Sequence, residues 1–136
     1  MAHVDDIEEI RQLIARICHF TDSGQYQRWV ECFANDGVLE FNGRRIVGHQ
    51  AILATREGLL GITPRRHWIS NVVIDVDGDE ATAASYLLEV SATSKPSVLM
   101  SGVYRDRIRR VDGTWRLSER VFVADGDGPT ASPAAD

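Results

Sequence analysis

Hydrophobic residues recur every three or four positions over residues 4–18, which is the period of an α-helix with one buried face. The apolar positions of this stretch are Ile7, Ile10, Leu13, Ile14, Ile17 and Cys18. After Ser23-Gly24 the same spacing returns, on Tyr26, Trp29, Val30 and Phe33. The pattern therefore predicts a long helix and a short one that meet near Asp22.

The next part of the chain combines turn signals with short apolar runs. Asn35-Asp36-Gly37 predicts a turn before a strand at 38–41. Asn42-Gly43 is a strong signal for a two-residue hairpin, with a partner strand at 44–47. A third helical stretch is expected after Gly48, and its apolar and terminating residues are Ile52, Leu59, Leu60, Gly61 and Pro64.

From residue 65 the hydrophobic period falls to two, which is typical of half-buried β-strands. The predicted strands are 66–76, 81–93, 98–110 and 115–123. Turn residues join them at Asp77-Gly78, Ser94–Ser97 and Asp112-Gly113. Consecutive hairpins imply an antiparallel sheet, and helices followed by strands favour an α+β fold with the helices packed on one sheet face.

Length and composition are those of one globular domain. The chain has 136 residues, of which 43% are hydrophobic, enough for a substantial core. We expect a single domain over residues 1–124. The segment 125–136 is rich in Gly, Pro, Ala and Asp and is expected to be a disordered tail.

Charge argues against several classes of partner. The formal net charge of −5 opposes binding to nucleic acid. Apolar runs are far too short to span a membrane, and four acidic residues among the first 15 are unlike a targeting peptide. We therefore expect a cytoplasmic protein in which Cys18 and Cys32 are buried, reduced thiols.

Four stretches, taken in order, carry a resemblance to a known family. They are TDSGQYQRW with FAND at 21–36, HWISN with VDGD at 67–79, GVYRD at 102–106 and GTWRL at 113–117. Over about residues 5–124 this order resembles the SnoaL-like and scytalone-dehydratase-like branch of the nuclear-transport-factor-2-like superfamily. The resemblance implies a cone, in which N-terminal helices and a strongly curved antiparallel sheet enclose a pocket.

Two residues are candidates for proton transfer. A lone carboxylate at Asp22, between apolar helical faces, would lose several kcal/mol of hydration, so it either caps the second helix or takes part in chemistry. Strand alternation places His67 on one sheet face with Ile69, Asn71 and Val73, and its imidazole suits acid–base work near neutral pH. A structural histidine at a strand end is the alternative. The resemblance implies that Asp22 and His67 form a catalytic pair across the pocket.

The resemblance also implies other pocket residues and exposes departures from the family pattern. Thr21 and Phe41 stand where scytalone dehydratases have tyrosines, and Ser91 stands near their second histidine. A faithful copy of that dehydration is therefore not expected. The further residues expected to line or support the pocket are Tyr26, Trp29, Trp68, Asn71 and Arg120.

No metal or cofactor is predicted, because the four histidines lack ligand spacing and no phosphate-binding glycine motif occurs. The sequence thus favours a cofactor-independent enzyme of the lyase or dehydratase, isomerase or cyclase type, acting on an apolar, cyclic small molecule. The alternative is a non-catalytic ligand-binding or subunit-association domain. A homodimer is expected in either case, because one face of so long a sheet would otherwise expose apolar residues.

Overall fold

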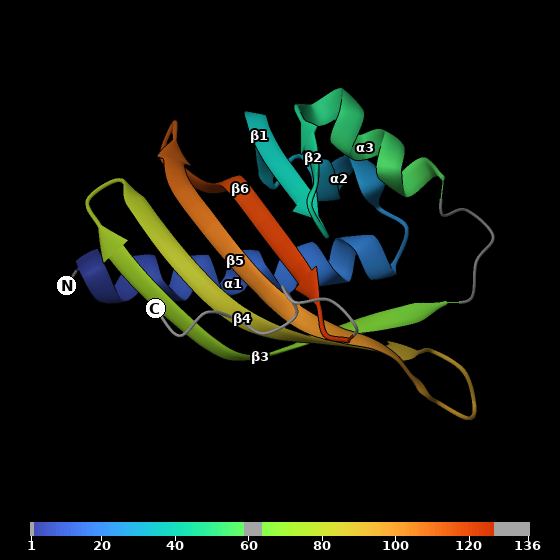
Figure 1. The fold of residues 1–136 in the computed structure, drawn as a ribbon. Coiled ribbons are helices and arrows are strands. Elements are labelled where there is room, and N and C mark those ends of the chain that lie inside the picture. Colours follow the sequence, from blue (N-terminus) through green and yellow to red (C-terminus); the bar gives the residue numbers. More distant parts are fainter. Residues whose placement is uncertain (1, 59–63, 127–136) are drawn as a thin grey trace.

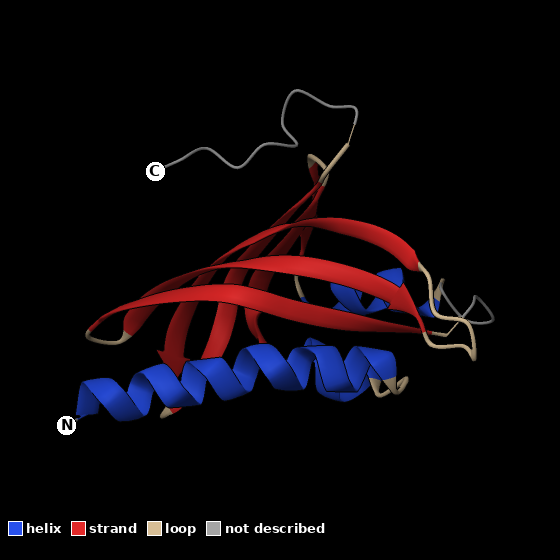
Figure 2. Ribbon diagram, turned by 90° about the horizontal axis from the view of Figure 1, so that it is seen from below, coloured by secondary structure: helices blue, strands red, loops and turns tan. Residues whose placement is uncertain are grey.

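A computed structural model describes residues 2–58 and 64–126. The elements in chain order are α1 (Ala2–Asp22), α2 (Tyr26–Val30), β1 (Phe33–Phe41), β2 (Arg44–Val47), α3 (His49–Glu57), β3 (Arg65–Asp77), β4 (Glu80–Ser91), β5 (Val98–Val111) and β6 (Thr114–Ala124). The strands form a curved sheet that arches over α1, with α2 and α3 at one end (Figures 1 and 2). The predicted α+β architecture, with helices on one side of a curved sheet, is confirmed.

The six strands lie in the order β2-β1-β6-β5-β4-β3. The predicted hairpins are present, and β3 to β6 pair antiparallel with their chain neighbours. One pairing was not predicted: β1 lies parallel to β6, with Leu39 opposite Arg120. This pairing attaches the β1–β2 hairpin to the last strand and places its residues beside the inner face of the long sheet.

The hairpin turns follow the local sequence signals. Asn42 and Gly43 have φ of 48° and 86°, and Asp112 and Gly113 have φ of 49° and 80°. Positive φ at both central residues is what a type I′ turn requires, and asparagine, aspartate and glycine tolerate it best.

Some predicted boundaries differ from the structure. Helix α1 extends beyond residues 4–18 at both ends, and β1 already begins at Phe33, where α2 was expected to continue. The predicted turn at residues 35–37 lies inside β1, where the register with β6 shifts between Phe33 and Val38. The irregularity keeps Gly37 close to neighbouring backbone, since a Cβ there would lie 2.9 Å from the Ala34 carbonyl oxygen.

Two sequence expectations fall on residues that the structure does not describe. Leu59, Leu60 and Gly61, expected at the end of the third helix, lie outside the described residues. Most of the expected tail, 127–136, lies outside them too, so its disorder stays a prediction. No helix in the described part of the chain has both the length and the apolar character needed to cross a membrane.

The interior contains two apolar clusters. The larger joins the buried face of α1 to α2 and the sheet, and its largest fully buried members include Ile10, Trp29, Phe33, Ile108 and Leu117. The smaller joins Leu87, Tyr104 and Phe122 near the other end of the sheet. A straight helix cannot follow the whole curve of the sheet, so space remains between these clusters.

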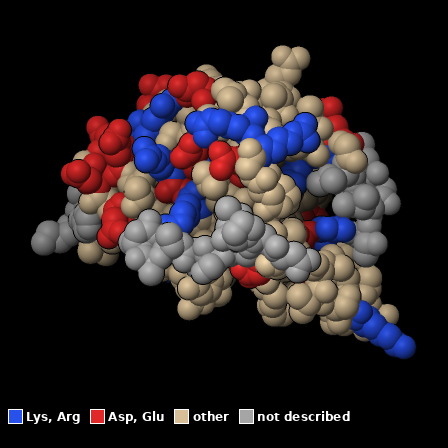
Figure 3. Space-filling model, in the orientation of Figure 1, with Lys and Arg blue, Asp and Glu red and all other residues tan. Residues whose placement is uncertain are grey.

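The outer face of the sheet carries paired charges. Glu119 on β6 contacts Arg45 of β2 at 3.0 Å and Arg107 of β5 at 3.8 Å, and Asp36 pairs with Arg109. Figure 3 shows acidic and basic side chains intermixed on this side of the molecule. Such exposed pairs contribute little to stability.

Strands β5 and β6 approach each other closely at Gly102. A Cβ at this position would lie 2.5 Å from both the Val123 carbonyl oxygen and the Phe122 ring. The Val123 carbonyl oxygen cannot move without disturbing the pairing of the two strands. We predict that Gly102→Ala lowers the free energy of unfolding by about 1–3 kcal/mol, measured by urea denaturation. Gly58→Ala is the control, because φ is −70° and the nearest atom is 3.9 Å away. Equal stability of the two variants would contradict this packing.

Candidate functional site

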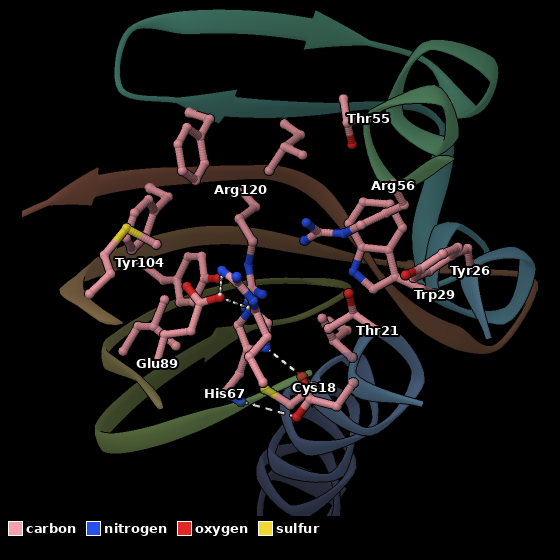
Figure 4. Close-up of a pocket in the computed structure, with 18 of the residues that line it drawn as sticks. Cys18, Thr21, Tyr26, Trp29, Thr55, Arg56, His67, Glu89, Tyr104 and Arg120 are labelled. Carbon is pink, nitrogen blue, oxygen red and sulfur yellow. Dashed lines mark hydrogen bonds and ion pairs between the residues drawn. The ribbon is translucent and has the colours of Figure 1, made fainter. Parts of the chain in front are cut away.

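A cavity of about 490 Å³ lies between the helices and the inner face of the sheet. Its apolar walls come from both core clusters and from the β1–β2 hairpin, and include Ile17, Trp29, Leu39, Ile46, Leu87, Met100 and Phe122. Its polar side chains include Thr21, Asp22, Tyr26, Arg56, His67, Glu89 and Arg120. Figure 4 labels all of these except Asp22 and shows the labelled groups around one space. A largely apolar hollow with a few convergent polar groups is the usual form of a ligand site.

The structure brings Asp22 and His67 together. Asp22 is the last residue of α1, and its Oδ1 lies 2.5 Å from Nδ1 of His67 on β3. Its other oxygen accepts the His67 backbone N–H at 3.0 Å. The side chains are only 12% and 11% exposed. Asp22 therefore does not cap α2, whose N-cap residue is Gln25 and has no side-chain capping bond.

This contact fixes how the imidazole can act. A carboxylate only accepts hydrogen bonds, so Nδ1 of His67 donates its hydrogen to Asp22, and in the neutral imidazole Nε2 then carries the lone pair. The nearest carboxylate oxygen to Nε2 is Oε1 of Glu89, at 4.0 Å, which is too far for a hydrogen bond. Nε2 is thus available to a molecule in the cavity.

Glu89 and Arg65 are site residues that were not predicted from the sequence. Glu89 lies opposite His67 in the β3–β4 register and is 3% exposed, and it accepts a 2.8 Å hydrogen bond from Nη1 of Arg65. The sequence did contain a signal for Glu89, because this glutamate lies between Leu88 and Val90 in a predicted strand with a buried face. An acidic residue that is buried in such a strand needs a charged or hydrogen-bonding partner.

Arg120 lines the cavity, as predicted, but its charge is neutralised. Its Nε and Nη2 donate to the two carboxylate oxygens of Asp106, each at 2.8 Å. Burial alone lowers the pKa of Arg120, but Asp106 more than offsets this and the pKa is raised overall. The guanidinium also lies 3.9 Å from the centre of the Tyr104 ring, where burial raises the phenol pKa to about 12.

Tyr26, Trp29 and Phe41 also line the cavity, whereas the expectation for Asn71 is wrong. Asn71 has φ of 54° at a bulge where the β3–β4 register shifts between Ser70 and Val73. The extra residue reverses the alternation of inward and outward side chains. Asn71 and Val73 are therefore exposed and not on the face of His67.

Two further expectations for the pocket are also wrong. Ser91 is buried, but outside the cavity, and its hydroxyl lies within hydrogen-bond distance of the hydroxyls of Thr93 and Ser97 in the β4–β5 connection. Trp68 follows His67 directly on β3, so it points to the opposite face and is 57% exposed. Ser91 therefore belongs to the β4–β5 connection and Trp68 to the outer face of the sheet, and neither lines the cavity.

In the part of the chain that the structure describes, His19, His49 and the two cysteines show no feature of a reactive centre. His19 is exposed, and Nε2 of His49 lies 2.7 Å from the Phe33 carbonyl oxygen, so His49 is half-buried and does not simply face solvent. Burial raises the pKa of Cys18, which lines the cavity, to about 11, so its thiol stays protonated at neutral pH. Within residues 2–58 and 64–126 no three His, Cys, Asp or Glu side chains form a group that could hold a metal ion.

Comparison with known proteins gives a consistent result. The family model for the SnoaL-like domain matches residues 2–121. A structure of a protein of unknown function from Mycobacterium tuberculosis is 31% identical, with a TM-score of 0.88, over 98% of this chain and 80% of that one. An NTF2-like protein with a cystatin-like fold from Novosphingobium aromaticivorans is 27% identical, with a TM-score of 0.85, over 96% of this chain and 88% of that one.

A third similar structure is that of a putative scytalone dehydratase from Novosphingobium aromaticivorans. It is 22% identical, with a TM-score of 0.82, over 98% of this chain and 96% of that one. At that identity the likeness shows a shared fold only. A search of curated proteins gave no match.

The buried Arg120–Asp106 pair provides a stability test. We predict that Asp106→Leu, which leaves the guanidinium buried without a counter-charge, lowers the free energy of unfolding by about 3–5 kcal/mol. Adding Arg120→Met should recover most of the loss, because no charge is then buried. Asp36→Asn is the matched control, since the Asp36–Arg109 pair is exposed and should contribute about 1 kcal/mol or less. Urea denaturation measures all of these variants, and an equal loss at both pairs would contradict the assignment.

Proposed function

The chain belongs to the SnoaL-like domain family, and from that premise we propose that it is a cofactor-independent enzyme that moves protons on an apolar, cyclic small molecule. The family includes dehydratases and cyclases, so the reaction class is that of a lyase, an isomerase or a cyclase. The observation that carries the proposal is the Asp22–His67 contact at 2.5 Å inside the cavity, together with an Nε2 that forms no hydrogen bond to the described residues.

In this proposal His67 is the acid–base group and Asp22 orients it. Nε2 takes a proton from a carbon next to a carbonyl group, and Asp22 stabilises the imidazolium that forms. In a dehydration the carbon–oxygen bond of a β-hydroxyl group then breaks, and the imidazolium returns the proton to the leaving oxygen as water. The proton that His67 takes from carbon is the one that it returns to the leaving oxygen, so the step needs no cofactor.

The volume and the aromatic lining of the cavity are the features that favour a cyclic substrate in this proposal. Its volume of about 490 Å³ lies within the usual range for small-molecule sites. Aromatic side chains line it: Trp29 is buried, and the Phe41 and Phe122 rings stack at 5.0 Å between centroids. Thr21 and Phe41 provide no phenol at the two positions where scytalone dehydratases have tyrosines, so a water held by those two phenols is not part of the proposed step.

We also propose that the protein is a homodimer. Trp68 and Leu88 lie opposite each other on β3 and β4, and Tyr86 lies opposite Ser70 on the next pair of the same face. Trp68, Tyr86 and nearby Val73 are 57%, 49% and 61% exposed. A contiguous apolar patch of this kind favours burial against a second copy. The same patch would serve the alternative role of a non-catalytic subunit-association domain.

The acid–base assignment is tested by replacing each member of the pair. We predict that Asp22→Asn and His67→Gln each lower the rate by about 10²–10⁴-fold, because proton transfer loses its base or the orientation of that base. The assay follows loss of water and uptake of deuterium from D₂O by bicyclic β-hydroxy ketones, using NMR. His19→Gln is the matched control, because His19 is exposed, and should keep the wild-type rate. Wild-type rates in both pair variants would reject the mechanism and favour the non-catalytic alternative.

The dimer is tested by placing charge on the patch. Trp68→Glu combined with Tyr86→Glu should give a monomer in analytical ultracentrifugation, with an unchanged circular dichroism spectrum. Val4→Glu is the control, since Val4 is 64% exposed on α1, away from the sheet face. A monomeric wild type, or a double variant that still dimerises, would show that this face is not the interface.

A further inference from the structure

Arg56 extends from α3 into the cavity and was not anticipated from the sequence. Its guanidinium lies 4.3 Å from the centre of the Trp29 ring. Figure 4 shows its terminal nitrogens pointing toward the space between Arg120 and Trp29. Trp29 is 2% exposed and packs in the core, so its ring offers the guanidinium a buried surface to stack against.

Arg56 differs from the other arginines deep in the cavity wall, because none of the described acidic residues forms an ion pair with it. Arg120 is paired with Asp106, and Arg65 with Glu89. Arg56 forms no ion pair within the described residues, and its buried Nε has no hydrogen-bond partner there. Burial lowers the pKa of Arg56, but an arginine remains charged in proteins. A desolvated, unpaired charge is unfavourable unless something else supplies the opposite charge.

The overall charge of the cavity wall also favours a negatively charged ligand. The charged side chains lining the cavity are Arg44, Arg56, Arg65, Arg120, Asp22 and Glu89. Arginines thus outnumber carboxylates even though the chain has a net charge of −5. Asp106, behind Arg120, neutralises one of them. With Asp106 included, four arginines face three carboxylates, which leaves an excess of one positive charge where a ligand would lie.

We infer that Arg56 binds a carboxylate group carried by the substrate, which makes the substrate class a cyclic carboxylic acid. The two terminal nitrogens of a guanidinium match the two oxygens of a carboxylate in one plane. Among the described residues Arg56 is the one arginine deep in the cavity wall without an ion pair, and its one positive charge matches one negative charge, which favours a carboxylate over a dianionic phosphate. This inference rests on the proposed function, because it names the substrate class of that same site.

The test compares an acid with its neutral analogue. The probes are 2-naphthylacetate and 2-naphthylacetamide, whose binding to the full chain is measured by calorimetry at pH 8. Wild type should bind the acid about 10- to 100-fold more tightly, as expected for hydrogen bonds between charged groups. Arg56→Met should remove this preference and leave the affinity for the amide unchanged. Arg56→Lys, which keeps the charge but not the planar fork, should retain part of it.

Two controls keep the outcome specific. Arg45→Met removes an exposed arginine that pairs with Glu40 and Glu119, outside the cavity, and should keep the wild-type preference. Arg56→Met should have a melting temperature equal to or above that of wild type, because it removes an unpaired buried charge. A lower melting temperature would identify Arg56 as a structural residue and overturn the inference.

The experiments distinguish failure of the carboxylate-binding role of Arg56 from failure of the acid–base role of His67. His67→Gln should keep the preference for the acid even though turnover is lost, since Arg56 is intact. Equal affinities of wild type for the acid and the amide, failure of the acid to bind, or a preference that persists in Arg56→Met would each overturn the carboxylate assignment. None of these results would affect the acid–base role of His67.

Discussion

The hydrogen bonds between Asp22 and His67 connect the end of α1 to the start of the long sheet, and the site depends on them. Both carboxylate oxygens are used, one on the imidazole and one on the backbone N–H of the same residue. A carboxylate buried among apolar helices needs such partners, and an imidazole held in this way has only one nitrogen left for other work. The same contact therefore satisfies a buried charge and orients a proton-transfer group.

The charged residues around the cavity differ in how completely the protein neutralises them. Arg120 and Asp106 are buried and form two hydrogen bonds with each other, so this pair has a structural role. Glu89 is buried but paired with the less buried Arg65, and it faces the free side of His67. Arg56 alone of the deep cavity arginines has no protein counter-charge within the described residues. Buried charges that the protein does not neutralise are unfavourable for folding, and ligand recognition is a physical reason for keeping one.

The sheet separates two tasks by the alternation of its side chains. Inward positions build the cavity, and outward positions of β3 and β4 form the apolar patch proposed for dimerisation. The bulge at Asn71 decides where this alternation reverses along β3. Before the bulge His67 points inward and Trp68 outward; after it Val72, Ile74 and Val76 pack against the core. The bulge thus supplies an apolar surface for α1 without moving His67 from the cavity.

The sequence by itself determined the elements, the hairpins and the identity of the Asp22–His67 pair, because helix period, strand alternation and turn residues are local, and the motif resemblance located the pair. It could not give the parallel β1–β6 pairing, which joins distant segments without a turn signal. Nor could it foresee the bulge, and the predicted positions of Asn71 and Val73 failed for that reason. The local sequence marked Glu89 as unusual, but its partner Arg65, the unpaired Arg56 and the Arg120–Asp106 pair were decided by folding, because burial and charge partners are properties of the packed chain.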